Sequence, residues 1–116
     1  MFNRVCFICA PKDWEMDEWL NYNDPRRADE SRLEIIYLTE GEVKYLFDIG
    51  MFFELHSYCD GIMNFYESCE IVGIVKLEMG LNDLKEFYDE KEPLINKIKK
   101  IFEVAIQYDT EVIFVF

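Results

Sequence analysis

The clearest pattern of hydrophobic and polar positions lies near the C-terminal end of the sequence. Pro93 suits the first turn of a helix, where its missing N–H costs no hydrogen bond. Apolar residues then recur at spacings of three and four, with polar residues between them. The apolar positions are Leu94, Ile95, Ile98, Ile101, Phe102, Ala105 and Ile106. This periodicity predicts an amphipathic helix with one buried face.

Four runs rich in β-branched and aromatic residues predict strands. They are residues 3–10, 32–38, 69–77 and 111–116. Pro11 ends the first run. The last run is almost continuously apolar, which is typical of an interior strand with both faces covered. We therefore expect the chain to finish in a buried strand that follows the amphipathic helix.

Shorter helices are predicted where a side chain can accept hydrogen bonds from the first backbone N–H groups. With their capping residues, these helices are 13–22 with Asp13, 48–58 with Asp48, and 82–88 with Asn82. Asp60-Gly61 is the expected end of the second helix. Residues 23–31 are polar, contain a proline, and are predicted to form the main surface loop.

Residues 39–47 admit two interpretations. In the preferred one, Thr39 to Glu42 turn the chain and 43–47 form the second strand of a hairpin. The alternative is a long helix beginning after Thr39, because the apolar spacing does not exclude it. Either way, strands and helices alternate imperfectly. The predicted fold is α+β: a mixed sheet of about four or five strands with helices packed on it.

Composition supports one globular domain over residues 1–116. The chain is 51% hydrophobic and 16% aromatic, which is enough to build a core and argues against disorder. The N-terminus shows no secretory signal, and no apolar run is long enough to cross a bilayer. We therefore expect a cytoplasmic protein, and its four cysteines to be reduced thiols.

Net charge narrows the possible partners. Acids outnumber bases 24 to 12, giving a formal net charge of −12. Direct binding to nucleic acid or to an anionic membrane is disfavoured, because both are polyanions. A basic protein is the expected partner. No exposed edge strand can be identified from the sequence, so a monomer or weak dimer is expected.

Two acidic segments are candidates for binding such a partner. The first interleaves acids with tryptophan and tyrosine, which are common at interface hot spots. Large aromatic residues are also common in cores, so a structural role for them remains open. The second segment lies between residues 78 and 92. The candidate partner-binding residues are Asp13, Trp14, Glu15, Asp17, Glu18, Trp19, Tyr22, Asp83, Glu86, Asp89 and Glu90.

Sulphur and imidazole side chains are the other candidates for chemistry. A zinc site or a reactive thiol would use Cys6, Cys9, His56, Cys59 and Cys69. Residues three apart on a strand point to opposite faces, however, so the first two cannot readily bind one ion. Buried thiols are the preferred interpretation. We predict no catalytic residues, no metal and no cofactor.

Two segments, 48–61 and 94–116, give the chain a resemblance to a known group of proteins. Together with the acidic composition, they resemble the small immunity proteins of bacterial contact-dependent and polymorphic toxin systems. The resemblance implies a non-catalytic inhibitor that neutralises a cognate basic toxin, with a nuclease domain as the expected target. It assigns no role to any individual residue.

An alternative function uses the same charge differently. The chain would mimic nucleic acid and inhibit a DNA-binding or defence enzyme. This requires carboxylates spaced like phosphates, roughly 7 Å apart or less. The second alternative is the zinc- or thiol-dependent protein described above.

Overall fold

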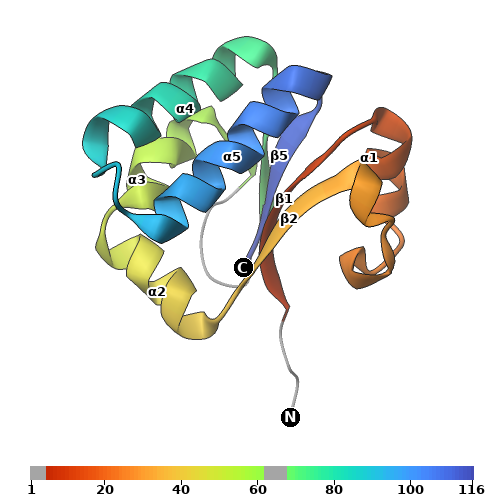
Figure 1. Cartoon of the computed structure of the whole chain (residues 1–116), viewed down its shortest axis with the longest axis horizontal. Helices are drawn as coiled ribbons and strands as arrows, with labels where there is room; N and C mark the ends of the chain where they lie inside the picture. Colours follow the sequence, from red (N-terminus) through yellow and green to blue (C-terminus); the bar gives the residue numbers. More distant parts are fainter. Residues whose placement is uncertain (1–4, 62–67) are drawn as a thin grey trace.

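An antiparallel sheet separates the helices into two unequal layers (Figure 1). The computed structural model describes residues 5–61 and 68–116. Within these residues the sheet has five strands in the order β2-β1-β5-β4-β3. The strands are β1 (Cys6–Pro11), β2 (Leu33–Leu38), β3 (Asp60–Gly61), β4 (Ser68–Val72) and β5 (Glu111–Val115). The predicted α+β class is confirmed.

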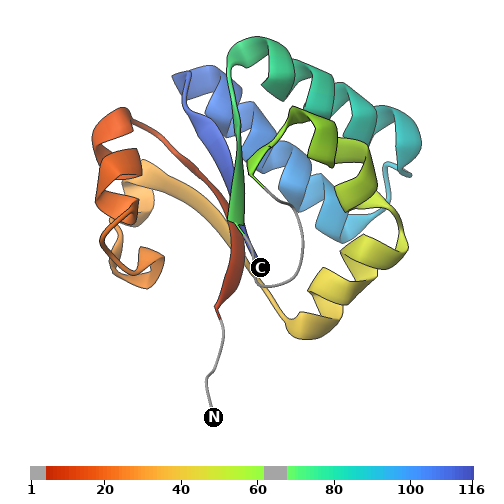
Figure 2. The ribbon, with the colours of Figure 1, turned by 180° about the vertical axis from the view of Figure 1, so that it is seen from behind.

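The two faces of the sheet carry different numbers of helices. Helix α1 (Trp14–Leu20) lies on one face, near β1 and β2 (Figures 1 and 2). The other face carries α2 (Glu40–Asp48), α3 (Met51–Leu55), α4 (Ile74–Phe87) and α5 (Pro93–Tyr108). Short 3₁₀ turns occupy Pro25–Arg27, Glu30–Arg32 and His56–Tyr58. No helix in the described part of the chain is long and apolar enough to cross a membrane.

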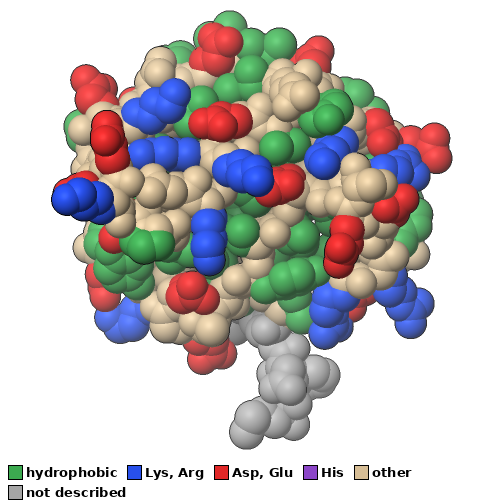
Figure 3. All heavy atoms as spheres, viewed as in Figure 1, with side chains coloured by type: hydrophobic (Ala, Val, Ile, Leu, Met, Phe, Trp, Pro, Cys, Tyr) green, Lys and Arg blue, Asp and Glu red, His purple; other side chains and the backbone are tan. Residues whose placement is uncertain are grey.

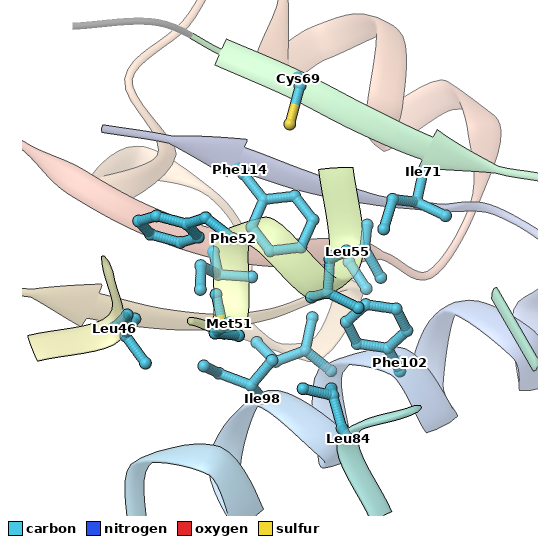
Figure 4. Packing of buried hydrophobic residues seen from close by; sticks show 14 of the residues in the cluster. Leu46, Met51, Phe52, Leu55, Cys69, Ile71, Leu84, Ile98, Phe102 and Phe114 are labelled. Atoms are coloured by element: carbon cyan, nitrogen blue, oxygen red, sulfur yellow. The ribbon is translucent and has the colours of Figure 1, made fainter. Parts of the chain in front are cut away.

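The hydrophobic core fills the space between the sheet and the four-helix layer. Phe102 of α5 and Phe114 of β5 are fully buried, and their ring centroids lie 6.3 Å apart. Helices α2, α3 and α4 add side chains to the same cluster (Figure 4). Burial of one such side chain contributes about 1.5–3 kcal/mol, so this layer carries most of the stability. One face of each strand is therefore buried in the core, and only the opposite face can carry functional side chains.

Strand β5 lies at the centre of the sheet, between β1 and β4, as its apolar sequence predicts. Its residues alternate strictly between the two faces. Val112 and Phe114 are buried in the core, while Glu111 and Ile113 point to the opposite face and are half-buried. The preceding helix α5 begins at Pro93, which confirms the amphipathic helix.

The hairpin predicted for residues 39–47 is wrong. Thr39 instead caps helix α2: its hydroxyl accepts from the Glu42 N–H at 3.1 Å, and the Glu42 carboxylate accepts from the Thr39 N–H at 3.0 Å. This reciprocal pair of hydrogen bonds satisfies two backbone N–H groups at the start of the segment and so favours a helix over a strand. The cap predicted for the helix over 48–58 is also wrong, because Asp48 ends α2; a shorter helix, α3, lies within that range. Gly50, with φ at 84°, separates α2 from α3.

The strand predicted for residues 69–77 ends early, at Val72. Gly73, with φ at 97°, turns the chain into α4, so Asn82 lies inside that helix and does not begin one. Leu77, Leu81 and Leu84 then face the core at helical spacing. The predicted helix over 13–22 is confirmed in α1 with its Asp13 cap. Residues 3 and 4 of the first predicted strand lie outside the described residues.

Candidate functional site

Three carboxylates gather on the sheet face opposite the core. Strand register pairs Asp60 with Glu70, and Glu70 with Ile113. Paired residues project from the same face, and Glu111 shares that face with Ile113. Strands β3, β4 and β5 therefore each place one acid on this surface.

Asp17 of α1 joins these three acids from above the sheet. It is half-buried and forms a side-chain hydrogen bond with Glu111. We refer to Asp17, Asp60, Glu70 and Glu111 together as the acidic sheet face. Its members come from four separate elements, so the tertiary fold brings them together.

The acidic sheet face holds a carboxyl group with an unusual proton affinity. The pKa of Glu111 is raised from its ordinary 4.5 to about 8, first by burial and then by the hydrogen bond and negative charge of Asp17. Glu70 and Asp60 contribute further repulsion. The pKa of Glu70 is also raised, first by burial and then by Asp60 and Asp17. At neutral pH the Glu111 carboxyl therefore keeps its proton, which it can donate to Asp17.

No lysine or arginine compensates these charges within the described residues. The ion pairs there involve other acids: Asp13, Glu15, Asp24, Glu34 and Asp48. The face seen in Figure 3, over α5, mixes acidic and basic side chains. The acidic sheet face therefore carries negative charge that no ion pair among the described residues neutralises.

The structure places the first predicted binding segment on α1, along one side of the acidic sheet face. Asp13 caps α1 and accepts two hydrogen bonds from Arg32, which lower its pKa to about 2. The Asp13 carboxylate therefore has a structural role: it caps α1 and holds it beside Arg32. Glu15 and Glu18 are exposed. Only Asp17 of this segment belongs to the acidic sheet face.

The aromatic residues of the same segment differ in exposure. Trp14 is 50% exposed, and its indole Nε1–H donates to the backbone oxygen of Asp109 at 3.0 Å. Tyr22 is 83% exposed, whereas Trp19 is half-buried. Neither Trp14 nor Tyr22 is a core residue, so both are available for contact with a partner.

The second predicted segment lies on the other side of the sheet, on α4 and the turn that follows it (Figures 1 and 2). The fold does not bring it together with α1. Asp83 accepts a hydrogen bond from the Tyr58 hydroxyl at 2.6 Å, and the Asp89 carboxylate accepts from the Lys91 N–H at 2.8 Å. Glu86 and Glu90 are exposed.

Sequence reasoning missed Asp60, Glu70 and Glu111. A signal was present in β4 and β5, because Glu70 lies within the first apolar run and Glu111 begins the second. Alternation within a strand shows that such a residue leaves the core face. It does not show which strands are neighbours, so the grouping required the observed register.

The residues proposed as zinc ligands are dispersed. Cys6 is part of the core cluster, and Cys9, three residues further along β1, lies on the opposite face. His56 is exposed. Among the described residues, no group of three or more histidine, cysteine or acidic side chains is arranged to hold a metal ion. Cys59 and Cys69 do lie together, with their sulphurs 3.1 Å apart.

Comparison with known proteins shows a likeness of fold. No family model and no curated protein matches the chain. A solved structure described as the Neisseria DNA mimic protein DMP12 has a TM-score of 0.65 and 18% sequence identity. The match covers 98% of this chain and 100% of that one. At this identity the similarity extends to the fold alone.

Proposed function

We propose that this protein is a non-catalytic inhibitor that mimics nucleic acid. Its acidic sheet face binds the basic surface of a nucleic-acid-binding protein and occupies the place of the phosphates. The observation that carries the proposal is the convergence of Asp17, Asp60, Glu70 and Glu111 without a compensating cation among the described residues.

Electrostatics supports this function. Holding like charges together disfavours the folded state, and Glu111 relieves the repulsion by keeping a proton. A lysine or arginine of a partner would lower the pKa of Glu111, so that the carboxyl group could release this proton. Strongly perturbed carboxyl groups of this kind are concentrated at functional sites. The negative charges of the other acids therefore favour binding of a cationic surface.

The spacing of the acids also suits mimicry. Directly opposed residues on neighbouring strands have Cβ atoms roughly 5 Å apart, and diagonal neighbours are roughly 7–8 Å apart. Asp60 and Glu70 are an opposed pair, and Glu70 and Glu111 are diagonal. These separations are close to the phosphate spacing of about 7 Å expected for a mimic.

The structural comparison agrees with this choice. The neighbouring fold belongs to a protein described as a DNA mimic. Because one fold can carry unrelated functions, the similarity only adds support to the charge arrangement. An immunity protein for a basic nuclease toxin remains the competing proposal, and it differs in requiring one cognate partner.

The test measures competition with duplex DNA. Several unrelated DNA-binding proteins are each loaded with labelled DNA, and displacement by this protein is followed by fluorescence anisotropy. We expect displacement from more than one of them, weakening as salt rises. Displacement from none would refute the proposal. Binding confined to a single basic nuclease would favour the immunity function.

A matched pair of variants separates the site from net charge. Variant one combines D60N and E70Q, which neutralise two acids of the acidic sheet face. The control combines E86Q and E90Q, which are exposed positions on α4 and in the following turn. Both variants replace two carboxylates, so they make the same formal change in net charge. We expect variant one to lose at least tenfold in potency and the control to lose less than threefold; equal losses would refute the assignment.

A further inference from the structure

Two cysteines lie in contact behind the acidic sheet face. Cys59 precedes β3 and Cys69 belongs to β4, and their sulphur atoms are 3.1 Å apart. Figure 4 shows the Cys69 side chain pointing from β4 toward the core. Both thiols are free. The two sulphurs can therefore bond with little movement of the backbone.

The two thiols differ in access. Cys69 is fully buried, whereas Cys59 is half-buried. The Cys69 thiol donates a hydrogen bond to the Cys59 sulphur, which raises the pKa of Cys69 together with burial. A thiolate at Cys59 would receive that hydrogen bond. Cys59 is thus the entry point for an oxidant, and Cys69 is placed to react second.

This pair is coupled by the chain to the acidic sheet face. Asp60 follows Cys59, Glu70 follows Cys69, and these two acids are register partners. Gly61 shows how closely β3 and β4 approach: a Cβ there would lie 2.9 Å from the Ser68 carbonyl oxygen. A bond between the cysteines would therefore limit separation of the two strands that carry Asp60 and Glu70.

We infer that Cys59 and Cys69 are a redox modification site, forming a reversible disulfide that fixes β3 against β4. Its effect on partner binding rests on the proposed function of the acidic sheet face. The other two cysteines do not form such a pair. Cys6 faces the core, and Cys9 faces the opposite side of β1.

The oxidant belongs to the class of small disulfides, for which glutathione disulfide is the probe. The Cys59 thiolate attacks one sulphur of the probe, breaking its S–S bond and releasing one glutathione thiolate. Cys69 then loses its proton and attacks the Cys59 sulphur, releasing the second. Two electrons pass to the probe, and the protons from the two protein thiols balance the two thiolates released.

Mass spectrometry tests the bond without reference to binding. The full chain is equilibrated in glutathione buffers of increasing oxidised fraction, quenched, alkylated and digested. We expect two cysteines to escape alkylation, a peptide linked through Cys59 and Cys69, and reversal by dithiothreitol. C59S should abolish the linkage and C6S should leave it. Four alkylated cysteines, a lasting glutathione adduct at Cys59, or linkage through another cysteine would overturn the inference.

Binding by the oxidised and reduced forms tests the coupling. Restricting β3 and β4 preorganises Asp60 and Glu70, so the oxidised form should displace DNA at least threefold more effectively. Equal potency of the two forms would refute the coupling. A disulfide that forms in a protein displacing no DNA would refute the proposed function alone. Displacement without disulfide formation would refute only the redox site.

Discussion

Replacing Glu111 with glutamine should make the protein more stable at pH 8, with a smaller gain at pH 5. The folded state holds the Glu111 proton more tightly than the unfolded chain, because its pKa rises from 4.5 to about 8. Wild-type stability therefore falls as pH rises through this window. Glutamine is neutral in both states and can still donate a hydrogen bond to Asp17. The stability of E111Q should therefore not decrease in this way as pH rises.

The size of the gain follows from the same pKa. The full rise would correspond to about 5 kcal/mol if Glu111 were shielded from water. The Glu111 carboxyl is only partly buried, so solvent screening reduces this to about 1–2 kcal/mol at pH 8. For a domain of this size, that difference raises Tm by roughly 3–8 °C.

Urea denaturation followed by tryptophan fluorescence at pH 5, 6, 7 and 8, at constant salt, provides the assay. Glu103→Gln is the matched control, because it makes the same carboxyl-to-amide replacement at an exposed position on α5. The stability difference between E111Q and wild type should grow with pH, and that of the control should stay constant. Parallel pH profiles for E111Q and wild type would refute the reasoning.

Three further predictions concern the helices. Gly80→Ala should destabilise the fold by about 1–2 kcal/mol. The alanine Cβ would lie 2.8 Å from Cε2 of the buried Phe102, and this steric clash outweighs the gain in helix propensity. Gly41→Ala meets only the Thr39 hydroxyl, at 3.8 Å, and should stabilise by up to about 1 kcal/mol; thermal melts showing the reverse order would contradict both. Thr39→Ala should cost about 1 kcal/mol in urea denaturation through loss of the cap shared with Glu42, and Thr39→Ser should restore most of it; an unchanged midpoint for the alanine variant would count against the cap.

Elements governed by local periodicity could be predicted from the sequence. Helix α5 combines Pro93 in its first turn with one continuous apolar face, and β5 is too apolar to lie at an exposed edge. Helix α2 begins after Thr39, as the alternative interpretation of residues 39–47 had it, and a local signal favours that alternative. Thr39 and Glu42 have the three-residue spacing of a capping box, a stronger signal than the loose alternation that suggested a hairpin.

Features that depend on tertiary pairing could not be predicted. The apolar run after Cys69 continues through Gly73 into α4, and neither strand nor helix propensity marks the boundary there. The acidic sheet face is a stronger case. Glu70 and Glu111 are far apart in sequence, and only the β4–β5 register brings them to one surface. Counting acids along the sequence favoured α1 and α4 as binding segments, because such a count cannot detect which strands are paired.

The central position of β5 also determines when the sheet can form during synthesis of the chain. Residues 111–115 lie between β1 and β4, so the sheet cannot close until the ribosome has released them. Until then, β1 and β4 each present an unpaired edge, which is the kind of surface that chaperones protect during translation. Cooperative folding of this sheet must therefore await β5.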